Sequence, residues 1–120
     1  MRVLAPAKVN LYLRITGRRA DGYHLLDSVM VPVSLCDEIE IIMASHTESM
    51  REPRILVTCD DPALPTDDTN LAYKAAALFC QEAGVEAEIS IALRKRIPFG
   101  AGLGGGSSDA ATALLGLNTL

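Results

Sequence analysis

Residues 98–109 read P-F-G-A-G-L-G-G-G-S-S-D and form the most glycine-dense segment of the chain. Five of the nine glycines lie between positions 100 and 106, and an alanine- and leucine-rich run follows the two serines. Backbone N–H groups can surround an anion only where no Cβ obstructs them, and a helix start adds the positive end of its dipole. The segment therefore predicts a phosphate-holding loop that opens a helix capped by Ser107 or Ser108.

Three interpretations of this loop compete. A Walker phosphate loop requires a lysine directly before the hydroxyl residue, and Gly106 stands there instead, which excludes it. A dinucleotide fingerprint is matched in letters by Gly100, Gly102 and Gly105, but the chain begins with consecutive strands and lacks the β-α-β context. A plain hinge is the third interpretation, and the capped helix start that follows the loop favours an anion site over it.

The composition indicates one small globular domain. The 120 residues are 49% hydrophobic and 22% charged, with a mean hydropathy of +0.23. The net charge of −4 disfavours a nucleic-acid partner, because binding to a phosphate backbone needs a dense basic face. There is no apolar run of membrane-spanning length and no ordered signal peptide at the N-terminus, so we expect a cytoplasmic protein without a membrane partner.

The spacing of the cysteines and of the acidic residues does not predict a metal site. Cys36, Cys59 and Cys80 are far apart and form no C-x-x-C pair, so we expect free thiols. The acidic residues between positions 60 and 68 lack the spacing of a calcium loop and are expected to shape turns and caps.

Hydrophobic periodicity predicts five strands and two helices, which is typical of the α+β class with a mixed or mostly antiparallel sheet. The strands are expected at residues 8–16, 23–35, 38–43, 55–59 and 87–97, and the helices at 70–83 and from 107 to the end. The first strand alternates, and we expect it to be half-buried through Val9, Leu11, Leu13 and Ile15.

Turn and cap residues locate the ends of these elements. A turn at 36–38 is expected to separate two strands, and strand 55–59 to pair with strand 38–43 across an exposed loop that holds His46. The first helix is expected to be capped by Asp68 or Thr69 and to end at Gly84. Its buried stripe is expected to contain Leu71, Ala75, Leu78 and Phe79. The last helix has no glycine or proline stop, which indicates a piece of a longer polypeptide.

The motif P-x-G-x-G-L-G-G-G-S-S-x-A-A at 98–111 resembles the second motif of the GHMP superfamily of small-molecule kinases. Three further segments occur in the order of one branch of that superfamily: A-P-A-K-V-N-L at 5–11, T-G-R-R-A-D-G-Y-H at 16–24 and D-T-N-L-A at 68–72. Together they cover the chain from end to end. The combination of A-K-x-N with D-G-Y-H is specific to the branch that phosphorylates diphosphocytidyl-methylerythritol.

The resemblance implies a ribosomal-protein-S5-domain-2-like fold for residues 1–120, as the N-terminal ATP-binding domain, with helices on one side of the sheet and the C-terminal domain absent. It also implies Mg²⁺-dependent transfer of the γ-phosphoryl of ATP to the 2-hydroxyl of a cytidine-diphosphate sugar alcohol in non-mevalonate isoprenoid synthesis. A catalytically silent nucleotide-binding fragment and another GHMP kinase are the alternatives, and an oxidoreductase is a more distant one. Oligomeric state is not implied.

Individual site residues follow from the same resemblance. The ATP phosphates would be held by Pro98, Gly100, Ala101, Gly102, Leu103, Gly104, Gly105, Gly106, Ser107 and Ser108, and either serine could reach Mg²⁺. Lys8 would be catalytic, Asn10 would contact the acceptor, and Tyr23 and His24 would bind its cytosine. The general-base aspartate is expected beyond residue 120, and Asp109 is not its substitute.

We predict that the isolated 120-residue chain does not turn over, because the expected base is not part of it. The measurement is ADP release in the presence of ATP, Mg²⁺ and the acceptor. Turnover that is detectable and that Lys8→Ala abolishes would contradict this expectation.

Overall fold

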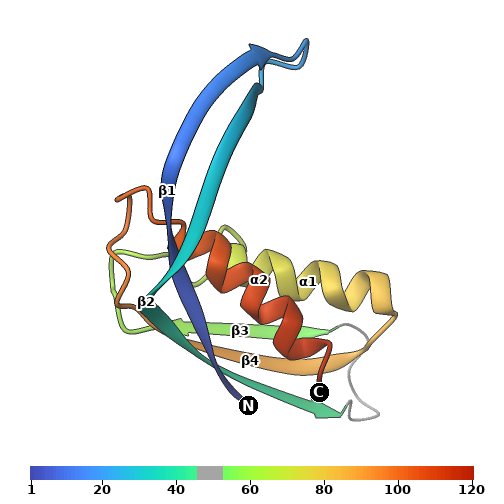
Figure 1. Ribbon diagram of the computed structural model, residues 1–120. Coiled ribbons are helices and arrows are strands. Elements are labelled where there is room, and N and C mark those ends of the chain that lie inside the picture. Colours follow the sequence, from blue (N-terminus) through green and yellow to red (C-terminus); the bar gives the residue numbers. More distant parts are fainter. Residues whose placement is uncertain (46–52) are drawn as a thin grey trace.

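The computed structural model describes residues 1–45 and 53–120, which fold as one mixed sheet with two helices (Figure 1). The elements in chain order are β1 (Arg2–Arg18), β2 (His24–Ser45), β3 (Arg54–Cys59), α1 (Leu71–Ala83), β4 (Ala87–Arg94) and α2 (Gly105–Leu117). Both helices cover the same face of the sheet, with α1 against β3 and β4 and α2 against β1 and β2. The predicted α+β class with helices on one side is confirmed.

The order of strands in the sheet is β1-β2-β4-β3. β2 is antiparallel to both β1 and β4, whereas β3 runs parallel to β4. The predicted turn at 36–38 is wrong, because Asp37 and Glu38 stay in the ladder opposite Ala5 and Leu4, and β2 is continuous. The predicted pairing of 55–59 with 38–43 is also wrong, because β4 lies between those two strands. His46 and most of the predicted loop around it lie outside the described residues.

The core lies between the sheet and the helices. Alternate residues of β4, among them Ile89, Ile91 and Leu93, point into it, and β2 contributes Ile39 and Ile41. β4 ends at residue 94, three residues earlier than expected.

Helix α1 buries its small residues and not the predicted large ones. Its buried positions are Ala72, Ala75, Ala76 and Cys80. Leu71 and Leu78 are about half-exposed, so the predicted stripe is wrong except at Ala75 and the partly buried Phe79. Small side chains allow α1 to lie close to α2, with which it shares many contacts.

The ends of α1 are set by two residues. The N-cap is Asn70, one residue after Thr69 and two after Asp68, and its Oδ1 accepts a hydrogen bond of 2.8 Å from the Ala72 N–H. Gly84 ends the helix in the left-handed conformation at φ +63°, as predicted.

Beyond the core, β1 and β2 extend as a curved two-stranded ribbon, here called the arm, made of residues 9–18 and 24–31 (Figure 1). The predicted strand at 8–16 is therefore confirmed as a strand. Its predicted half-burial is wrong, because Leu11 is 71% and Ile15 is 62% exposed. The alternation predicts one buried face, but neither face of the arm is covered in the described chain.

Gly116 lies where α2 crosses β2, and we predict that Gly116→Ala destabilises the fold by about 1–2 kcal/mol. A Cβ there would overlap the Cδ1 of the fully buried Ile41. Overpacking costs about 1–3 kcal/mol, and the better helix propensity of alanine returns at most about 1 kcal/mol. Chemical denaturation measures the change.

Ile41→Val removes the obstructing Cδ1 and should cost about 0.5–1.5 kcal/mol alone. In the Gly116→Ala background the same change should cost less or be stabilising. Strict additivity of the two changes in the free energy of unfolding would show that the overlap is not the cause.

Candidate nucleotide site

The loop between β4 and α2 has an alternating backbone handedness. Gly100, Gly102 and Gly104 have φ values of +72°, +72° and +75°, and the non-glycine residues between them keep negative φ. A Cβ at Gly100 or Gly102 would meet nothing within 4 Å, so the conformation and not the lack of space requires glycine there. Alternating handedness turns successive N–H groups toward one side, which creates a concave anion-binding surface.

Helix α2 begins at Gly105, two or three residues earlier than expected. Its N-cap is Gly104, with no side-chain cap, so the predicted capping by Ser107 or Ser108 is wrong. Both serines lie within the first turn, and Ser107 is exposed. A helix start without a side-chain cap leaves backbone donors available to an anion.

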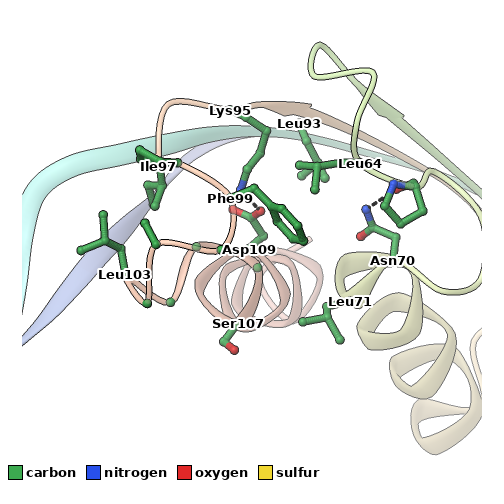
Figure 2. A pocket seen from close by; sticks show the side chains of 18 of the residues that line it. Leu64, Asn70, Leu71, Leu93, Lys95, Ile97, Phe99, Leu103, Ser107 and Asp109 are labelled. Atoms are coloured by element: carbon green, nitrogen blue, oxygen red, sulfur yellow. Dashed lines mark hydrogen bonds and ion pairs between the residues drawn. The ribbon is translucent and has the colours of Figure 1, made fainter.

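A cavity of about 400 Å³ lies in front of this loop, within the range of small-molecule sites. Of the predicted phosphate-loop residues, Pro98 and residues 100–107 line it and Ser108 does not. The Ser107 side chain points away from Lys95 and Phe99 (Figure 2). The other lining side chains are mostly apolar: Leu64, Pro65, Leu71, Leu93, Ile97 and Phe99. The cavity thus has a polar backbone wall and an apolar slot, which suits a phosphate chain joined to a flat base.

Strand β1 brings Lys8 to the loop. The Lys8 N–H donates a 2.9 Å hydrogen bond to the carbonyl of Leu103. The Lys8 side chain lies against Gly104, where a Cβ would stand 3.1 Å from its Cγ. Lys8 Nζ is 3.4 Å from Asn10 Oδ1, to which it donates. The structure therefore brings together three of the predicted features: the glycine loop, Lys8 and Asn10.

Tyr23 and His24 lie elsewhere, at the far end of the arm. Tyr23 is 73% exposed, and His24 pairs with Arg18 next to the turn. Pro32, the partner of Lys8, is eight positions along β2 from His24, which is roughly 26 Å along the ribbon at ~3.3 Å per residue. Neither residue lines the cavity. The arm curves, so the direct distance is shorter than the path along it.

A buried ion cluster behind the loop was not anticipated from the sequence. Lys95 Nζ donates to Asp37 Oδ2 and to Asp109 Oδ2, each at 2.5 Å, and all three side chains are at most 7% exposed. Asp37 Oδ1 also accepts the backbone N–H groups of Arg96 at 2.6 Å and Ile97 at 2.9 Å. The cluster ties β2, the segment after β4 and α2 together at both ends of the loop. Figure 2 shows Lys95 and Asp109, the two members that line the cavity.

The three groups of the cluster titrate differently. Burial acts to raise the pKa of Asp37, but hydrogen bonds from two backbone N–H groups and Lys95 hold it below its usual range. Burial raises the pKa of Asp109 against the opposing effect of Lys95, and its Oδ1 has no partner among the described residues. Burial acts to lower the pKa of Lys95, but the two carboxylates raise it above its usual range.

The sequence did contain one signal for this cluster. Asp37 interrupts a long apolar strand, and an acid at such a position needs a buried partner. The turn interpretation of residues 36–38 concealed that signal.

Other potential ligands are scattered over the described residues. No group of three histidine, cysteine or acidic side chains within residues 1–45 and 53–120 could hold a metal ion. The three cysteines are free thiols, and burial raises the pKa of Cys59 and Cys80. Neither helix of the described chain has the length and hydrophobicity to cross a membrane.

Comparison with known proteins finds one family. The model of the GHMP kinases N terminal domain matches residues 70–120. The 4-diphosphocytidyl-2-C-methyl-D-erythritol kinase of Geobacter sp. strain M21 is 48% identical over 120 residues, which are all of this chain and 41% of that protein. The kinase of the same name from Thermosynechococcus vestitus is 50% identical over 121 residues, with 99% of this chain and 37% of that protein covered.

Solved structures agree in fold. A crystal structure of 4-(cytidine 5'-diphospho)-2C-methyl-D-erythritol kinase matches with a TM-score of 0.77 and 44% identity, over 99% of this chain and 40% of that one. Homoserine kinase from Cytophaga hutchinsonii, with a TM-score of 0.67 and 23% identity over 99% of this chain and 34% of that one, shares the fold. The chain thus spans about 40% of the length of these kinases.

We predict that Asp109→Asn changes how stability depends on pH. Because the pKa of Asp109 is higher in the folded chain than its ordinary 3.8, the folded state binds more protons between the two values. The free energy of unfolding therefore falls as pH rises through that interval. Asparagine does not titrate, so the free energy of unfolding of Asp109→Asn should lack this decrease. The difference in the free energy of unfolding between the variant and the wild type should therefore shift in favour of the variant as pH rises from 4 toward 7.

Denaturant titrations of both proteins across this range measure the difference. The lowered pKa of Asp37 gives the opposite slope below 3.8 and is common to both proteins, so it largely cancels. Parallel pH profiles would rule out the titration of Asp109 as the source.

Proposed function

We propose that this chain is the N-terminal, ATP-binding part of a GHMP-family kinase for 4-(cytidine 5'-diphospho)-2-C-methyl-D-erythritol, which the family match over residues 70–120 and the similarity to kinases of that name support. The reaction would transfer the γ-phosphoryl of ATP to the 2-hydroxyl of that acceptor, in the non-mevalonate route to isoprenoids. The observation that carries the proposal is the contact of Lys8 with a loop of three left-handed glycines. Whole-chain identity near 48% to kinases of that name supports the choice of acceptor.

In this proposal the loop binds the phosphates of ATP through its backbone. Residues 100–106 offer N–H groups without obstructing side chains, and the start of α2 adds its dipole. The base would lie in the apolar slot near Leu93 and Phe99. Mg²⁺ would neutralise charge on the β- and γ-phosphates, with a serine hydroxyl of the first turn of α2 within reach after a rotamer change.

Lys8 would act on the transferred phosphoryl group. Its ammonium lies beside Asn10 at the base of the arm, where the loop and β1 meet. A cation at this place would offset the negative charge that spreads over the phosphoryl oxygens in the transition state. Asn10 would orient Lys8 and contact the acceptor.

Neither carboxylate of the buried cluster serves as the general base. Asp37 accepts three hydrogen bonds. Asp109 is buried against Lys95, and its unpartnered Oδ1 has no exposed surface. We therefore propose that the proton acceptor comes from polypeptide corresponding to the other three-fifths of the relatives. Tyr23 and His24 would bind the cytosine at the end of the arm.

Binding of a non-hydrolysable ATP analogue with Mg²⁺, measured by calorimetry, tests the nucleotide site. Gly102→Ala should weaken binding at least tenfold, because alanine resists the left-handed conformation at φ +72°. Gly84→Ala is the matched control, since Gly84 is also left-handed, at +63°, and equally open but lies at the end of α1. Its effect on affinity should stay below twofold.

The same titration with NAD tests the remaining alternative, a dinucleotide-binding protein. Affinity for NAD without affinity for the ATP analogue would overturn the kinase assignment in favour of a dinucleotide-binding protein. Equal losses in both glycine variants would show that the loop is not the site.

A further inference from the structure

The wall of the cavity contains one ion pair. Of the described residues that line the cavity, only Lys95 and Asp109 are charged, and Lys95 Nζ donates to Asp109 Oδ2 at 2.5 Å. Figure 2 shows these two side chains pointing toward one another. Asp37, which does not line the cavity, accepts from the same ammonium, also at 2.5 Å. One positive charge therefore faces two negative charges, and the three side chains together carry a formal charge of −1.

The carboxylate of Asp109 exceeds what Lys95 needs for charge balance. Asp37 already compensates the ammonium, and its carboxylate also accepts two backbone hydrogen bonds, from Arg96 and Ile97. Asp109 Oδ1, by contrast, is buried without a partner among the described residues. Burial of a polar oxygen without a hydrogen bond costs stability. Asp109 is therefore a surplus charge that the fold accommodates at a cost.

A neutral side chain of the same shape would avoid this cost. The amide oxygen of an asparagine at position 109 can accept from Lys95 as Asp109 Oδ2 does, because the amide and the carboxylate have the same outline. The salt bridge between Lys95 and Asp37 would remain. Proteins retain groups that cost stability chiefly where function requires them. The charge of Asp109, and not only its hydrogen bond to Lys95, is therefore the feature that needs an explanation.

That charge lies close to the start of α2. Asp109 follows Gly105, the first residue of the helix, by four positions, which is roughly 6 Å along the axis at ~1.5 Å per residue. An anion bound by the N–H groups at the start of α2 would lie near this carboxylate, beside apolar side chains that shield both from water. Like charges repel more strongly there than in water. Lys95 does not cancel the repulsion, because its charge is shared with Asp37.

We propose that Asp109 lowers the affinity of the nucleotide site, because its buried charge repels the phosphate groups that the loop binds. The inference rests on the proposed binding of ATP phosphates to the loop, and it adds a residue that limits how tightly they bind. Product release is slow in many enzymes, and a loop of backbone donors at a helix start favours tight binding of phosphates. Repulsion by Asp109 speeds the release of a nucleotide diphosphate. The effect increases with the number of negative charges on the ligand.

Titration of the wild type and of Asp109→Asn with ligands of increasing charge tests the proposal. The ligands are adenosine, AMP, ADP and a non-hydrolysable ATP analogue, without Mg²⁺, and the dissociation constants come from NMR titrations of the loop amides. The variant should bind the ATP analogue about fivefold more tightly or better, and ADP and AMP with successively smaller gains. Its affinity for adenosine should change by less than about 1.5-fold, since adenosine carries no charge. A change in the shape of the cavity would alter adenosine binding as well.

Glu38→Gln is the matched control. It removes the same formal charge from the residue next to Asp37 in β2, but Glu38 pairs with Arg94 and Arg96 at the exposed surface. Solvent and salt screen exposed charges, so its effect on the affinity for the ATP analogue should stay below about 1.5-fold. Buried charges are screened less, so most of the gain in Asp109→Asn should remain at about 0.5 M NaCl.

The outcomes separate this inference from the proposed function. Equal affinities of the wild type and Asp109→Asn for the ATP analogue would overturn the inference and leave the nucleotide site in place. An equal gain for adenosine and for the ATP analogue would also overturn it, because geometry and not charge would then be the cause. Loss of the thermal unfolding transition in Asp109→Asn would show that the charge is not surplus. Absence of binding of the ATP analogue to both proteins would overturn the inference together with the proposed function.

Discussion

The salt-bridged Lys95 holds the sheet and the glycine-rich loop in one geometry. Its ammonium bridges Asp37 in the middle of β2 and Asp109 on α2, with all three side chains withdrawn from water. Removing one member of such a cluster leaves a buried charge without compensation, at a cost of about 3–5 kcal/mol. The ends of the loop are thereby fixed before any ligand arrives, and the loop between them needs only the left-handed glycines to complete its shape. Preorganisation of this kind spares a ligand the entropy of ordering the loop.

In this arrangement the charged side chains and the backbone have different roles. The buried charges give rigidity and contribute little surface to the cavity, whereas the groups that face the cavity are mainly backbone amides and apolar side chains. Lys8 lies beside the loop at Gly104 but does not line the cavity, and its backbone N–H donates to the carbonyl of Leu103. A phosphate chain in the cavity would therefore meet neutral backbone donors, with the Lys8 side chain next to the loop that holds them.

The sequence predicted the parts that depend on local pattern. The glycine-rich loop before α2, the strand periodicity of β4 and the glycine that ends α1 each depend on neighbouring residues, and each lies where it is predicted, while phosphate binding by the loop stays a prediction. The errors involve interactions between distant segments. Asp37 was read as a turn because its partner Lys95 lies 58 residues away. β3 was paired with β2 because β4, which separates them, comes later in the chain. The stripe of α1 was placed on leucines because nothing in the sequence revealed how closely α2 approaches.

The continuity of β2 has a mechanical consequence. One uninterrupted strand carries His24 at the tip of the arm and Asp37 at the root of the loop, with no turn between them. Because a sheet strand resists stretching, a displacement of the arm would act on the part of β2 that contains Asp37. A load placed on the tip must bend the ribbon or strain the hydrogen bonds that Asp37 accepts from Arg96 and Ile97.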